Sequence, residues 1–252
     1  MSVRRVAVIT GGNRGIGLGI AKRYLEDGWM VVVGCRDPEC FPKQIKTNDL
    51  AIFKIDVRIE ETLVALANFA LNKFGRIDAW INNAGFSKWS PIEEIDNSFL
   101  TEIFETNLFG AFWGCKVAAS KLVSGGVIIN VSSIAGKRGS ANNSAYASTK
   151  FAMNGLTQSL AKELGKRGIR VNGICPVLVE TLGLTEALAQ RNAPAEGQDV
   201  FRYLKTFCET NAALNFLPSV ENVGDMAVFL SSEKASAITG QNINVDCGVF
   251  PQ

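Results

Sequence analysis

The chain has 252 residues, of which 47% are hydrophobic and 20% charged, and its formal net charge is +2. This is the composition of an ordinary globular protein, and so small a net charge gives no reason to expect nucleic acid or a membrane surface as a partner. No apolar run approaches the ~20 residues that span a bilayer. The first residues do not resemble a signal peptide, so we expect a cytoplasmic protein.

The chain contains six cysteines and no histidine. The cysteines are scattered and form no CxxC pair, so we predict no metal site of the usual Cys/His kind. The lack of histidine also excludes any mechanism that needs a histidine base. We expect most of the cysteines to be small buried hydrophobic residues.

Short apolar runs alternate with longer amphipathic stretches along the chain. Apolar runs of this kind are typical of parallel strands buried on both faces, and the alternation predicts right-handed crossovers. The expected fold is α/β: a doubly wound, Rossmann-type parallel sheet in a three-layer α/β/α arrangement. We find no repeat or linker and predict a single domain over residues 1–252. The expected strands are Val6–Ile9, Met30–Val33, Leu50–Ile55, Asp78–Ile81, Val127–Val131, Ile169–Ile174 and Ile243–Val245.

A glycine-rich segment, Thr10-Gly11-Gly12-Asn13-Arg14-Gly15-Ile16-Gly17, follows the first strand and opens the first helix. Glycines permit a tight turn and let backbone N–H groups approach a pyrophosphate, while the helix N-terminus supplies partial positive charge. The segment therefore predicts a dinucleotide site. The alternative is a plain strand-to-helix loop.

Two further motifs follow, Asn82-Asn83-Ala84-Gly85 after the fourth strand and Tyr146-Ala147-Ser148-Thr149-Lys150 in a later helix. In this order and spacing, the three motifs resemble the short-chain dehydrogenase/reductase family of the classical type, over essentially the whole chain. The resemblance implies a nicotinamide cofactor and a homo-oligomer, a tetramer or a dimer.

The end of the second strand should decide which cofactor is bound. Members of the family that use NAD place an acidic residue there to hold the ribose 2′-hydroxyl. By resemblance, the equivalent position in this chain is Cys35, and Arg36 follows it. A guanidinium can bind a 2′-phosphate bidentately, and Arg14 could add a second donor. We therefore expect NADP(H), with NAD(H) possible: a two-residue shift in register would put Asp37 on the ribose instead.

Other cofactor contacts are implied by the resemblance alone: Asp56 and Val57 at the adenine, and the Pro176–Thr181 segment at the nicotinamide carboxamide. The full set of residues expected to bind the cofactor is Gly11, Asn13, Arg14, Gly15, Ile16, Gly17, Arg36, Asp56, Val57, Asn83, Ala84, Gly85, Tyr146, Lys150, Pro176, Val179 and Thr181.

The reactive residues are expected around Tyr146 and Lys150, which share one helix face because they are four residues apart. Apolar residues at helical spacing from Ala152 to Leu164 predict a packing stripe on the other side of this helix. A tyrosine is a poor base near neutral pH, and we expect the Lys150 ammonium and the oxidised cofactor to lower its pKa.

Two more catalytic residues come from the resemblance. Ser133, which we prefer to the adjacent Ser132, matches the serine that hydrogen-bonds the substrate oxygen. Asn107 matches the asparagine whose carbonyl holds a relay water. Tyr146 would act as general acid/base, and Lys150 would also hold the ribose hydroxyls.

The stretch near 182–217 does not fit the strand–helix alternation and carries two helix-like pieces, near 184–191 and 199–210. Ligands of doubly wound sheets sit beyond the carboxyl ends of the strands, so this insertion is placed to act as a substrate lid. The alternative is a structural helical hairpin. The chain also departs from the family pattern at Val177 and Cys247, where glycine is common.

The predicted function is an NADP(H)-dependent oxidoreductase that moves a hydride between the cofactor and a carbonyl or secondary alcohol. Pocket walls are expected from 86–89, 134–140, 177–178 and the insertion, and they leave the substrate open. A non-catalytic NADP(H)-binding sensor on the same fold is the alternative.

Overall fold

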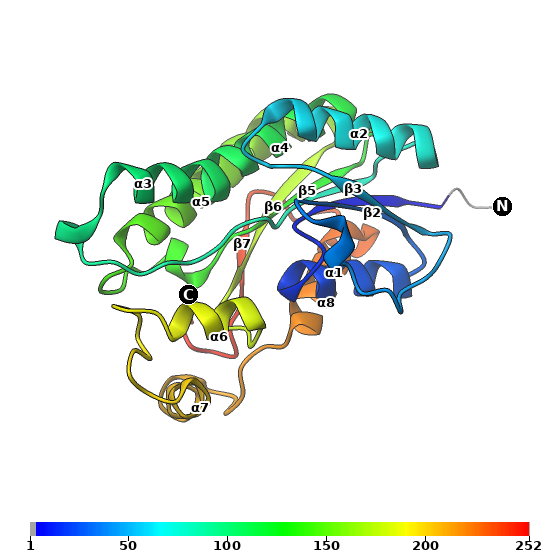
Figure 1. The fold of residues 1–252 in the computed structure, drawn as a ribbon. Helices are drawn as coiled ribbons and strands as arrows, with labels where there is room; N and C mark the ends of the chain where they lie inside the picture. Colours follow the sequence, from blue (N-terminus) through cyan, green and yellow to red (C-terminus); the bar gives the residue numbers. More distant parts are fainter. Residues whose placement is uncertain (1–3, 252) are drawn as a thin grey trace.

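The computed structural model describes residues 4–251 (Figure 1), and its centre is one parallel sheet of seven strands in the order β3-β2-β1-β4-β5-β6-β7. The carboxyl ends of all the strands therefore meet at one edge, and the strand order reverses between β1 and β4, where doubly wound folds bind their ligands. Each predicted strand is confirmed within one or two residues at its ends. The strands are β1 Val6–Thr10, β2 Met30–Cys35, β3 Leu50–Lys54, β4 Ala79–Asn82, β5 Val127–Val131, β6 Arg170–Pro176 and β7 Asn242–Val245.

Helices cover both faces of the sheet, which confirms the three-layer arrangement. In Figure 1, α2, α4 and α5 lie above the sheet and α1 and α8 below it. The helix bounds are α1 Gly15–Glu26, α2 Glu60–Phe74, α3 Asn97–Phe104, α4 Gly110–Lys121, α5 Ser144–Leu164, α6 Leu182–Leu188, α7 Val200–Asn211 and α8 Val220–Ser231.

The alternation of side chains along the strands divides the core in two. Val6 and Val8 of β1 pack on the α2–α4–α5 side, and Ala7 and Ile9 pack on the α1–α8 side. All four are fully buried, as a strand covered on both faces requires. This is why the strands are continuous apolar runs in the sequence.

The predicted packing stripe of α5 is only partly confirmed: Leu164 is buried in the core and Leu156 and Leu160 pack against it. Ala152 is exposed and Leu156 and Leu160 are only half-buried, whereas Lys150, Asn154 and other residues of the opposite face are buried. The buried face carries polar residues that hydrogen-bond to the core, such as Asn154 to the Gly136 carbonyl at 2.9 Å. The apolar residues therefore mark only the flank of the buried face, and the prediction that the reactive pair faces away from the packing is wrong for Lys150, which is buried on that face.

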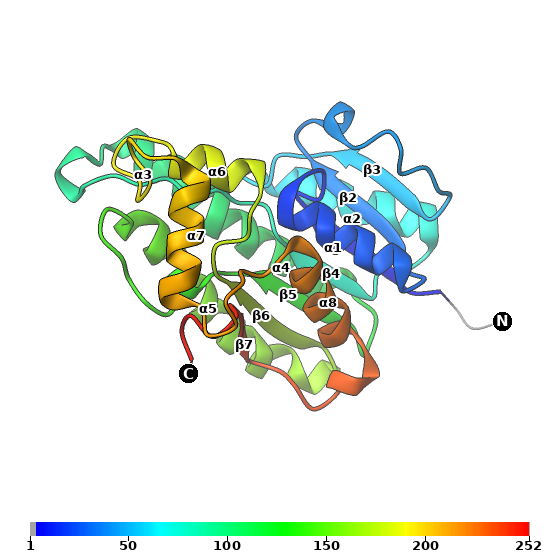
Figure 2. The same cartoon turned by 90° about the horizontal axis from the view of Figure 1, so that it is seen from below.

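The two helical pieces predicted in the insertion are present as α6 and α7. Figure 2 shows both at one end of the molecule, away from α2. They pack on a small cluster of their own that includes Leu188 and Leu204 together with Trp89, which precedes α3. The β6–α8 connection thus forms a separately packed layer.

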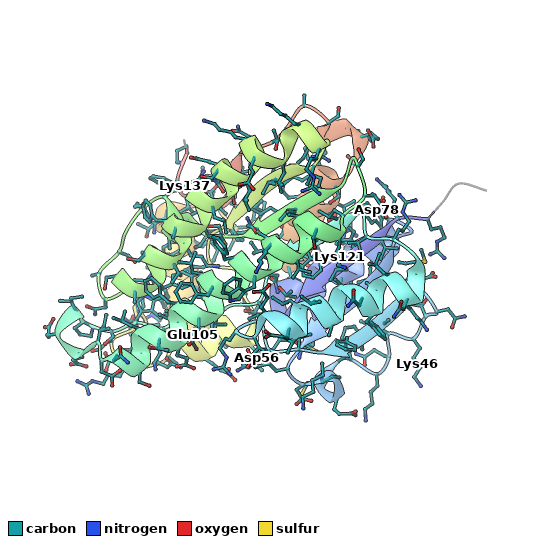
Figure 3. The ribbon with its side chains drawn as sticks, turned by 90° about the horizontal axis from the view of Figure 1, so that it is seen from above. Lys46, Asp56, Asp78, Glu105, Lys121 and Lys137 are labelled. Atoms are coloured by element: carbon teal, nitrogen blue, oxygen red, sulfur yellow. The ribbon has the colours of Figure 1, made fainter. Side chains whose placement is uncertain are left out.

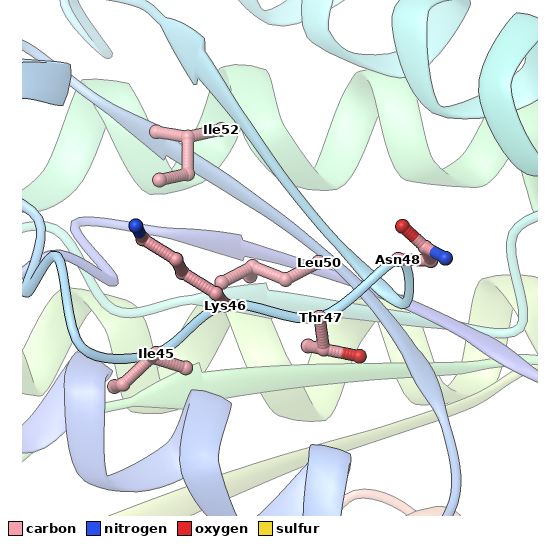
Figure 4. Close-up of a pocket in the computed structure, with 6 residues that line it drawn as sticks. All are labelled: Ile45, Lys46, Thr47, Asn48, Leu50 and Ile52. Atoms are coloured by element: carbon pink, nitrogen blue, oxygen red, sulfur yellow. The ribbon is translucent and has the colours of Figure 1, made fainter.

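An open depression of about 700 Å³ lies beside the edge strand β3 (Figure 4). It is lined by Ile45, Lys46, Thr47, Asn48, Leu50 and Ile52, none of which belongs to the predicted site. Within residues 4–251, none of the helices combines the length and apolarity needed to cross a bilayer.

Candidate active site

The glycine-rich loop turns sharply between β1 and α1 at two glycines. Gly11 has φ +66° and Gly15 has φ +54°, backbone conformations that residues other than glycine rarely adopt. A Cβ on Gly17 would lie 2.3 Å from the Asn83 amide nitrogen and 2.3 Å from the Gly11 carbonyl oxygen. The loop therefore closes tightly on itself, and only glycine fits at its centre.

The segment after β4 holds this loop in place. The Thr10 hydroxyl accepts hydrogen bonds from the backbone N–H groups of Asn83 at 3.1 Å and Ala84 at 3.2 Å. The Asn83 amide donates in return to the carbonyls of Thr10 at 3.0 Å and Gly11 at 3.1 Å. The first and fourth strands are thus tied together where the strand order reverses.

The N-terminus of α1 has the character of an anion site. Its N-cap residue, Arg14, makes no side-chain capping bond, and the first turn contains no acidic residue. The helix begins at Gly15, so the first turn starts without a side chain, and Ile16 follows only half-buried. A pyrophosphate fits such a terminus, because free backbone N–H groups and the helix dipole both favour negative charge.

The end of β2 carries no free carboxylate directed at a ribose. Cys35 is buried and packs in the core, and Arg36 is exposed beyond it. The Asp37 carboxylate caps the next turn, accepting from the Glu39 N–H at 3.2 Å and from the Cys40 thiol at 2.9 Å. Asn13 reaches the same segment, with its amide 3.5 Å from the Asp37 carbonyl.

Asp56, which follows β3, is engaged in an ion pair that the sequence did not suggest. The Arg58 Nε lies 2.9 Å and 3.0 Å from the two carboxylate oxygens of Asp56, and this pairing lowers the pKa of Asp56. Arg36 is close enough to lower that pKa further. Figure 3 shows Asp56 at the same edge as Glu105, while Val57 is buried against Gly110.

Ser133, Tyr146 and Lys150 meet at the carboxyl ends of β5 and β6. Ser133 is close enough to Tyr146 to act on its pKa, and its hydroxyl donates to the Pro176 carbonyl at 3.5 Å. The Lys150 ammonium lies 5.6 Å from the centre of the Tyr146 ring and donates to the Val131 carbonyl at 2.9 Å. Lys150 itself is only 4% exposed, so its charge is held under the tyrosine.

The neighbouring Ser132 takes a different position. It is buried, and its hydroxyl donates to the Lys150 backbone carbonyl at 3.3 Å. Ser133, by contrast, is half-buried and caps the turn Ile134–Gly136 by accepting from the Ala135 N–H. Successive residues at the end of a strand point to opposite sides, so only one of the two serines can reach the tyrosine hydroxyl.

Burial controls the titration of this pair. It raises the pKa of Tyr146 to about 12, although the hydrogen bond from Ser133 acts in the other direction. It also lowers the pKa of Lys150 to about 8. Lys150 alone therefore does not produce the downward shift expected for the tyrosine, because desolvation of the phenolate outweighs the charge beside it.

Asn107 lies in a π-helical turn, Glu105–Phe109, between α3 and α4. It is fully buried, and its amide group forms two hydrogen bonds with the backbone of Phe86, accepting at 3.0 Å and donating at 2.8 Å. A Cβ on Gly85 would lie 3.0 Å from the Asn107 side-chain oxygen. Such single π turns are frequent at functional sites.

The segment after β6 closes the site from the other side. Val177 and Val179 are buried, and the Thr181 hydroxyl caps α6 by accepting from the Leu184 N–H at 3.2 Å. A Cβ on Gly15 would lie 3.5 Å from the Thr181 methyl group, so this segment touches the glycine-rich loop. The residues expected at the phosphates and at the nicotinamide are thus neighbours.

Two of the basic residues expected in the pocket walls have other partners. The Lys88 ammonium lies 4.7 Å from the centre of the Phe99 ring, and the Arg138 guanidinium lies 5.3 Å from that of Phe250. The third basic residue, Lys137, acts on the buried Cys175 thiol: burial raises the pKa of this thiol, and the charge of Lys137 lowers it.

A buried polar network behind the site was missed. Asn82 in β4 donates to Asn130 in β5 at 2.9 Å, and Asn130 donates to the Thr157 hydroxyl of α5 at 2.9 Å. The network links two strands to the helix that carries Tyr146 and Lys150. Its signal was an asparagine within each of two otherwise apolar strands.

Comparison with known proteins decides the family. The family model described as enoyl-(acyl carrier protein) reductase matches residues 11–250. L-2,3-butanediol dehydrogenase of Corynebacterium glutamicum is 34% identical, over 98% of this chain and 98% of its own length. The structure of a short-chain dehydrogenase/reductase (glucose/ribitol dehydrogenase) from Brucella melitensis matches with a TM-score of 0.89 and 28% identity, over 98% of this chain and 97% of that chain.

The chain belongs to the short-chain dehydrogenase/reductase family. A further member, the 3-ketoacyl-(acyl-carrier-protein) reductase of Brucella melitensis, was solved with NADH and matches with a TM-score of 0.85 and 28% identity, over 98% of this chain and 99% of that chain. Family membership makes this protein an oxidoreductase with a nicotinamide cofactor. It also confirms the resemblance that the three motifs carried.

Proposed function

We propose that the protein is an NADP(H)-dependent oxidoreductase that interconverts a carbonyl and a secondary alcohol, with Tyr146 as its general acid/base. The observation that carries the proposal is the meeting of Ser133, Tyr146 and Lys150: Ser133 is close enough to lower the pKa of Tyr146, and the Lys150 ammonium lies 5.6 Å from the centre of the tyrosine ring. The relative named as a butanediol dehydrogenase supports the class of substrate.

In the direction of reduction, each residue has a role that its position supports. A reduced nicotinamide held at this edge would be the source of the hydride for the carbonyl carbon. The Ser133 hydroxyl donates a hydrogen bond to the carbonyl oxygen and so stabilises the developing negative charge. Tyr146 donates its proton to the same oxygen. A pKa of about 12 keeps the tyrosine protonated at neutral pH, ready to act as an acid.

Lys150 and Asn107 would assist this proton transfer without contacting the carbonyl oxygen themselves. The Lys150 ammonium would hold the ribose hydroxyls and stabilise the phenolate once the proton has left. The Asn107 side chain is fully occupied by Phe86, so its proposed role in a proton relay falls to its backbone carbonyl.

Replacing Tyr146 by Phe tests the assignment. The variant should fold and bind the cofactor, because only one hydroxyl is lost, but kcat should fall by at least ~10²–10⁴-fold, the usual contribution of general acid catalysis. Oxidation of NADPH is followed by absorbance with a panel of ketones and aldehydes. Near wild-type kcat in the variant would show that another group donates the proton.

The preference for NADP(H) rests on the end of β2. Arg36 is exposed there, Arg14 is exposed at the start of α1, and the carboxylate of Asp37 is already engaged by Glu39 and Cys40. Charged hydrogen bonds from the two arginines should favour NADP(H) over NAD(H) by roughly tenfold to a hundredfold. The engaged carboxylate argues against the alternative register, in which Asp37 holds the ribose.

Dissociation constants of both cofactors, measured by fluorescence titration, test this preference. Arg36→Ala should weaken NADPH binding and leave NADH binding nearly unchanged. Cys35→Asp should go further, because a carboxylate at that position repels the phosphate and can accept from the ribose hydroxyls. Tighter binding of NADH than of NADPH by the wild type would mean that Asp37 holds the ribose.

We also propose that the protein is a homo-oligomer, a tetramer or a dimer. Phe109, Phe112 and Phe151 are each about half exposed at or beside α4 and α5, the helices that face the viewer in Figure 3. Large exposed apolar side chains gathered on one face are typical of an interface between subunits. Light scattering in solution measures the mass and decides the number of subunits.

A further inference from the structure

Both departures from the family pattern, Val177 and Cys247, fall on one small apolar cluster. Its buried centre is formed by Val177, Ala212 and Val249, and we call it the tail cluster. Cys208 of α7 and Cys247 of the C-terminal segment both pack against this centre. The cluster thus joins the end of β6, the second helix of the insertion and the end of the chain.

The segment that follows Cys208 is in direct backbone contact with Cys247. The Ala212 N–H donates to the Cys208 carbonyl at 2.9 Å, so Cys208 lies one helical turn before Ala212 on the same face of α7. Two residues later, the Leu214 N–H donates to the Cys247 carbonyl at 3.2 Å. The two thiols therefore approach the tail cluster from adjoining segments.

Cys247 is held in a strained turn. Its φ is +53°, a backbone conformation that residues other than glycine adopt only at a cost in energy. The Asp246 carboxylate fixes the turn by accepting from the N–H groups of Gly248 at 3.1 Å and Phe250 at 2.9 Å. Strain of this kind persists where the side chain has a use that glycine cannot supply.

An oxidant can reach the pair. Cys208 is half-buried and lines an open cavity of about 420 Å³ between α7 and the start of α8. Cys247 is also only half-buried, and both are free thiols. Burial raises the pKa of Cys247, and the neighbouring Cys208 adds to this effect because two thiolates would repel each other. Cys208, which lines the cavity, is the thiol that an oxidant entering there meets first.

We propose that Cys208 and Cys247 are a reversible redox modification site, in which a disulfide ties α7 to the C-terminal segment. With hydrogen peroxide as the oxidant, the Cys208 thiolate attacks one peroxide oxygen, the O–O bond breaks, and the departing hydroxide takes up a proton to become water. The Cys247 sulfur then attacks the resulting sulfenic acid and displaces a second water. Two thiols and one peroxide thus give one disulfide and two waters, and a dithiol reductant reverses the reaction.

Peptide mapping tests the link directly. Trypsin cuts after Lys205 and Lys234, so residues 206–234 and 235–252 are released as two peptides with one cysteine each. After treatment of the folded protein with hydrogen peroxide, these peptides should appear joined, lighter by two hydrogen atoms than their sum, and should separate with dithiothreitol. Cys40, which is exposed, reports that the oxidant has acted. Oxidised Cys40 without the joined peptides would overturn the proposal.

A second measurement follows the helix itself. In the linked protein, amide hydrogen exchange over residues 206–214 should slow by at least roughly threefold, because a covalent tie suppresses local opening of α7. Cys208→Ala and Cys247→Gly should abolish this protection, and glycine accepts the φ of Cys247 without strain, so that variant folds. Unchanged exchange in fully linked protein would contradict the tie. Neither readout depends on the substrate, the cofactor or the catalytic role of Tyr146.

Discussion

The cofactor side of the molecule and the substrate side are held together in different ways. On the cofactor side, the loop after β1 is fixed by four hydrogen bonds between Thr10, Gly11 and the segment at Asn83. The strand that precedes this loop is fully buried. On the substrate side, α6 and α7 pack on a small separate cluster around Leu188, Leu204 and Trp89.

The two sides also differ in what they expose. Leu182, Phe201, Leu214 and Phe216 of the substrate side are each more than half exposed. A region with few buried contacts opens at a lower free energy than the central sheet. The residues proposed for the chemistry therefore lie on the tightly held side, and the insertion proposed as a lid lies on the side that is packed independently.

The largest effect expected from this comparison is on the cofactor side. In Gly17→Ala the new Cβ would lie 2.3 Å from a backbone oxygen, so the loop must open. Overpacking of this kind costs about 3 kcal/mol, which should weaken NADPH binding roughly a hundredfold. Fluorescence titration measures it.

Gly155→Ala is the matched control for this change, because a Cβ on this exposed glycine of α5 meets nothing within 4 Å. It should leave NADPH binding unchanged and raise the free energy of unfolding by about 1 kcal/mol, since alanine favours a helix over glycine. Equal loss of binding in both variants would show that the loop is not the rigid element described above.

The second effect concerns Lys150, whose pKa is lowered to about 8 from the ordinary 10.5. This difference in pKa between the folded and unfolded states means that, below pH 8, the buried charge of Lys150 lowers the free energy of unfolding by roughly 3 kcal/mol. Lys150→Met should therefore raise the free energy of unfolding by up to about this amount at pH 7, even as it removes activity and weakens cofactor binding. Urea unfolding at several pH values measures it.

The pH dependence fixes the sign of this prediction. Between pH 8 and 10.5 the folded wild type binds fewer protons than its unfolded state, so its stability rises with pH. The advantage of Lys150→Met should accordingly be full below pH 8 and vanish above 10.5. An advantage independent of pH would trace the effect to packing of the methionine.

The smallest effect is expected on the substrate side. Trp89→Ala removes the aromatic ring on which the insertion packs, so trypsin should cleave at Arg202 and Lys205, both exposed, roughly tenfold faster, as a loss of about 1.4 kcal/mol in local stability implies. NADPH binding should not change. Phe201→Ala, at an exposed position of α7, should behave as wild type.

The same cleavage assay tests the lid. Cofactor together with a substrate analogue should protect residues 182–217 in the wild type if the insertion closes over the site. Equal cleavage rates with and without these ligands would reduce the insertion to a structural hairpin.

The sequence by itself determined the strands, their parallel arrangement and the position of the glycine-rich loop. These features follow from local patterns: runs of β-branched residues are buried on both faces, Gly11 and Gly15 have positive φ, and Gly17 stands where a Cβ would clash. It also brought Tyr146 and Lys150 onto one face, since residues four apart on a helix are neighbours.

Only the tertiary structure decided which face of α5 is buried, because polar residues such as Asn154 and Thr157 find partners in the core that apolar periodicity cannot reveal. It also decided that burial raises the pKa of Tyr146, since burial depends on everything packed around a side chain. In the same way, only the fold set Cys208 and Cys247 on one cluster. Contacts between distant segments and the desolvation they cause are properties of the folded chain, and no local pattern encodes them.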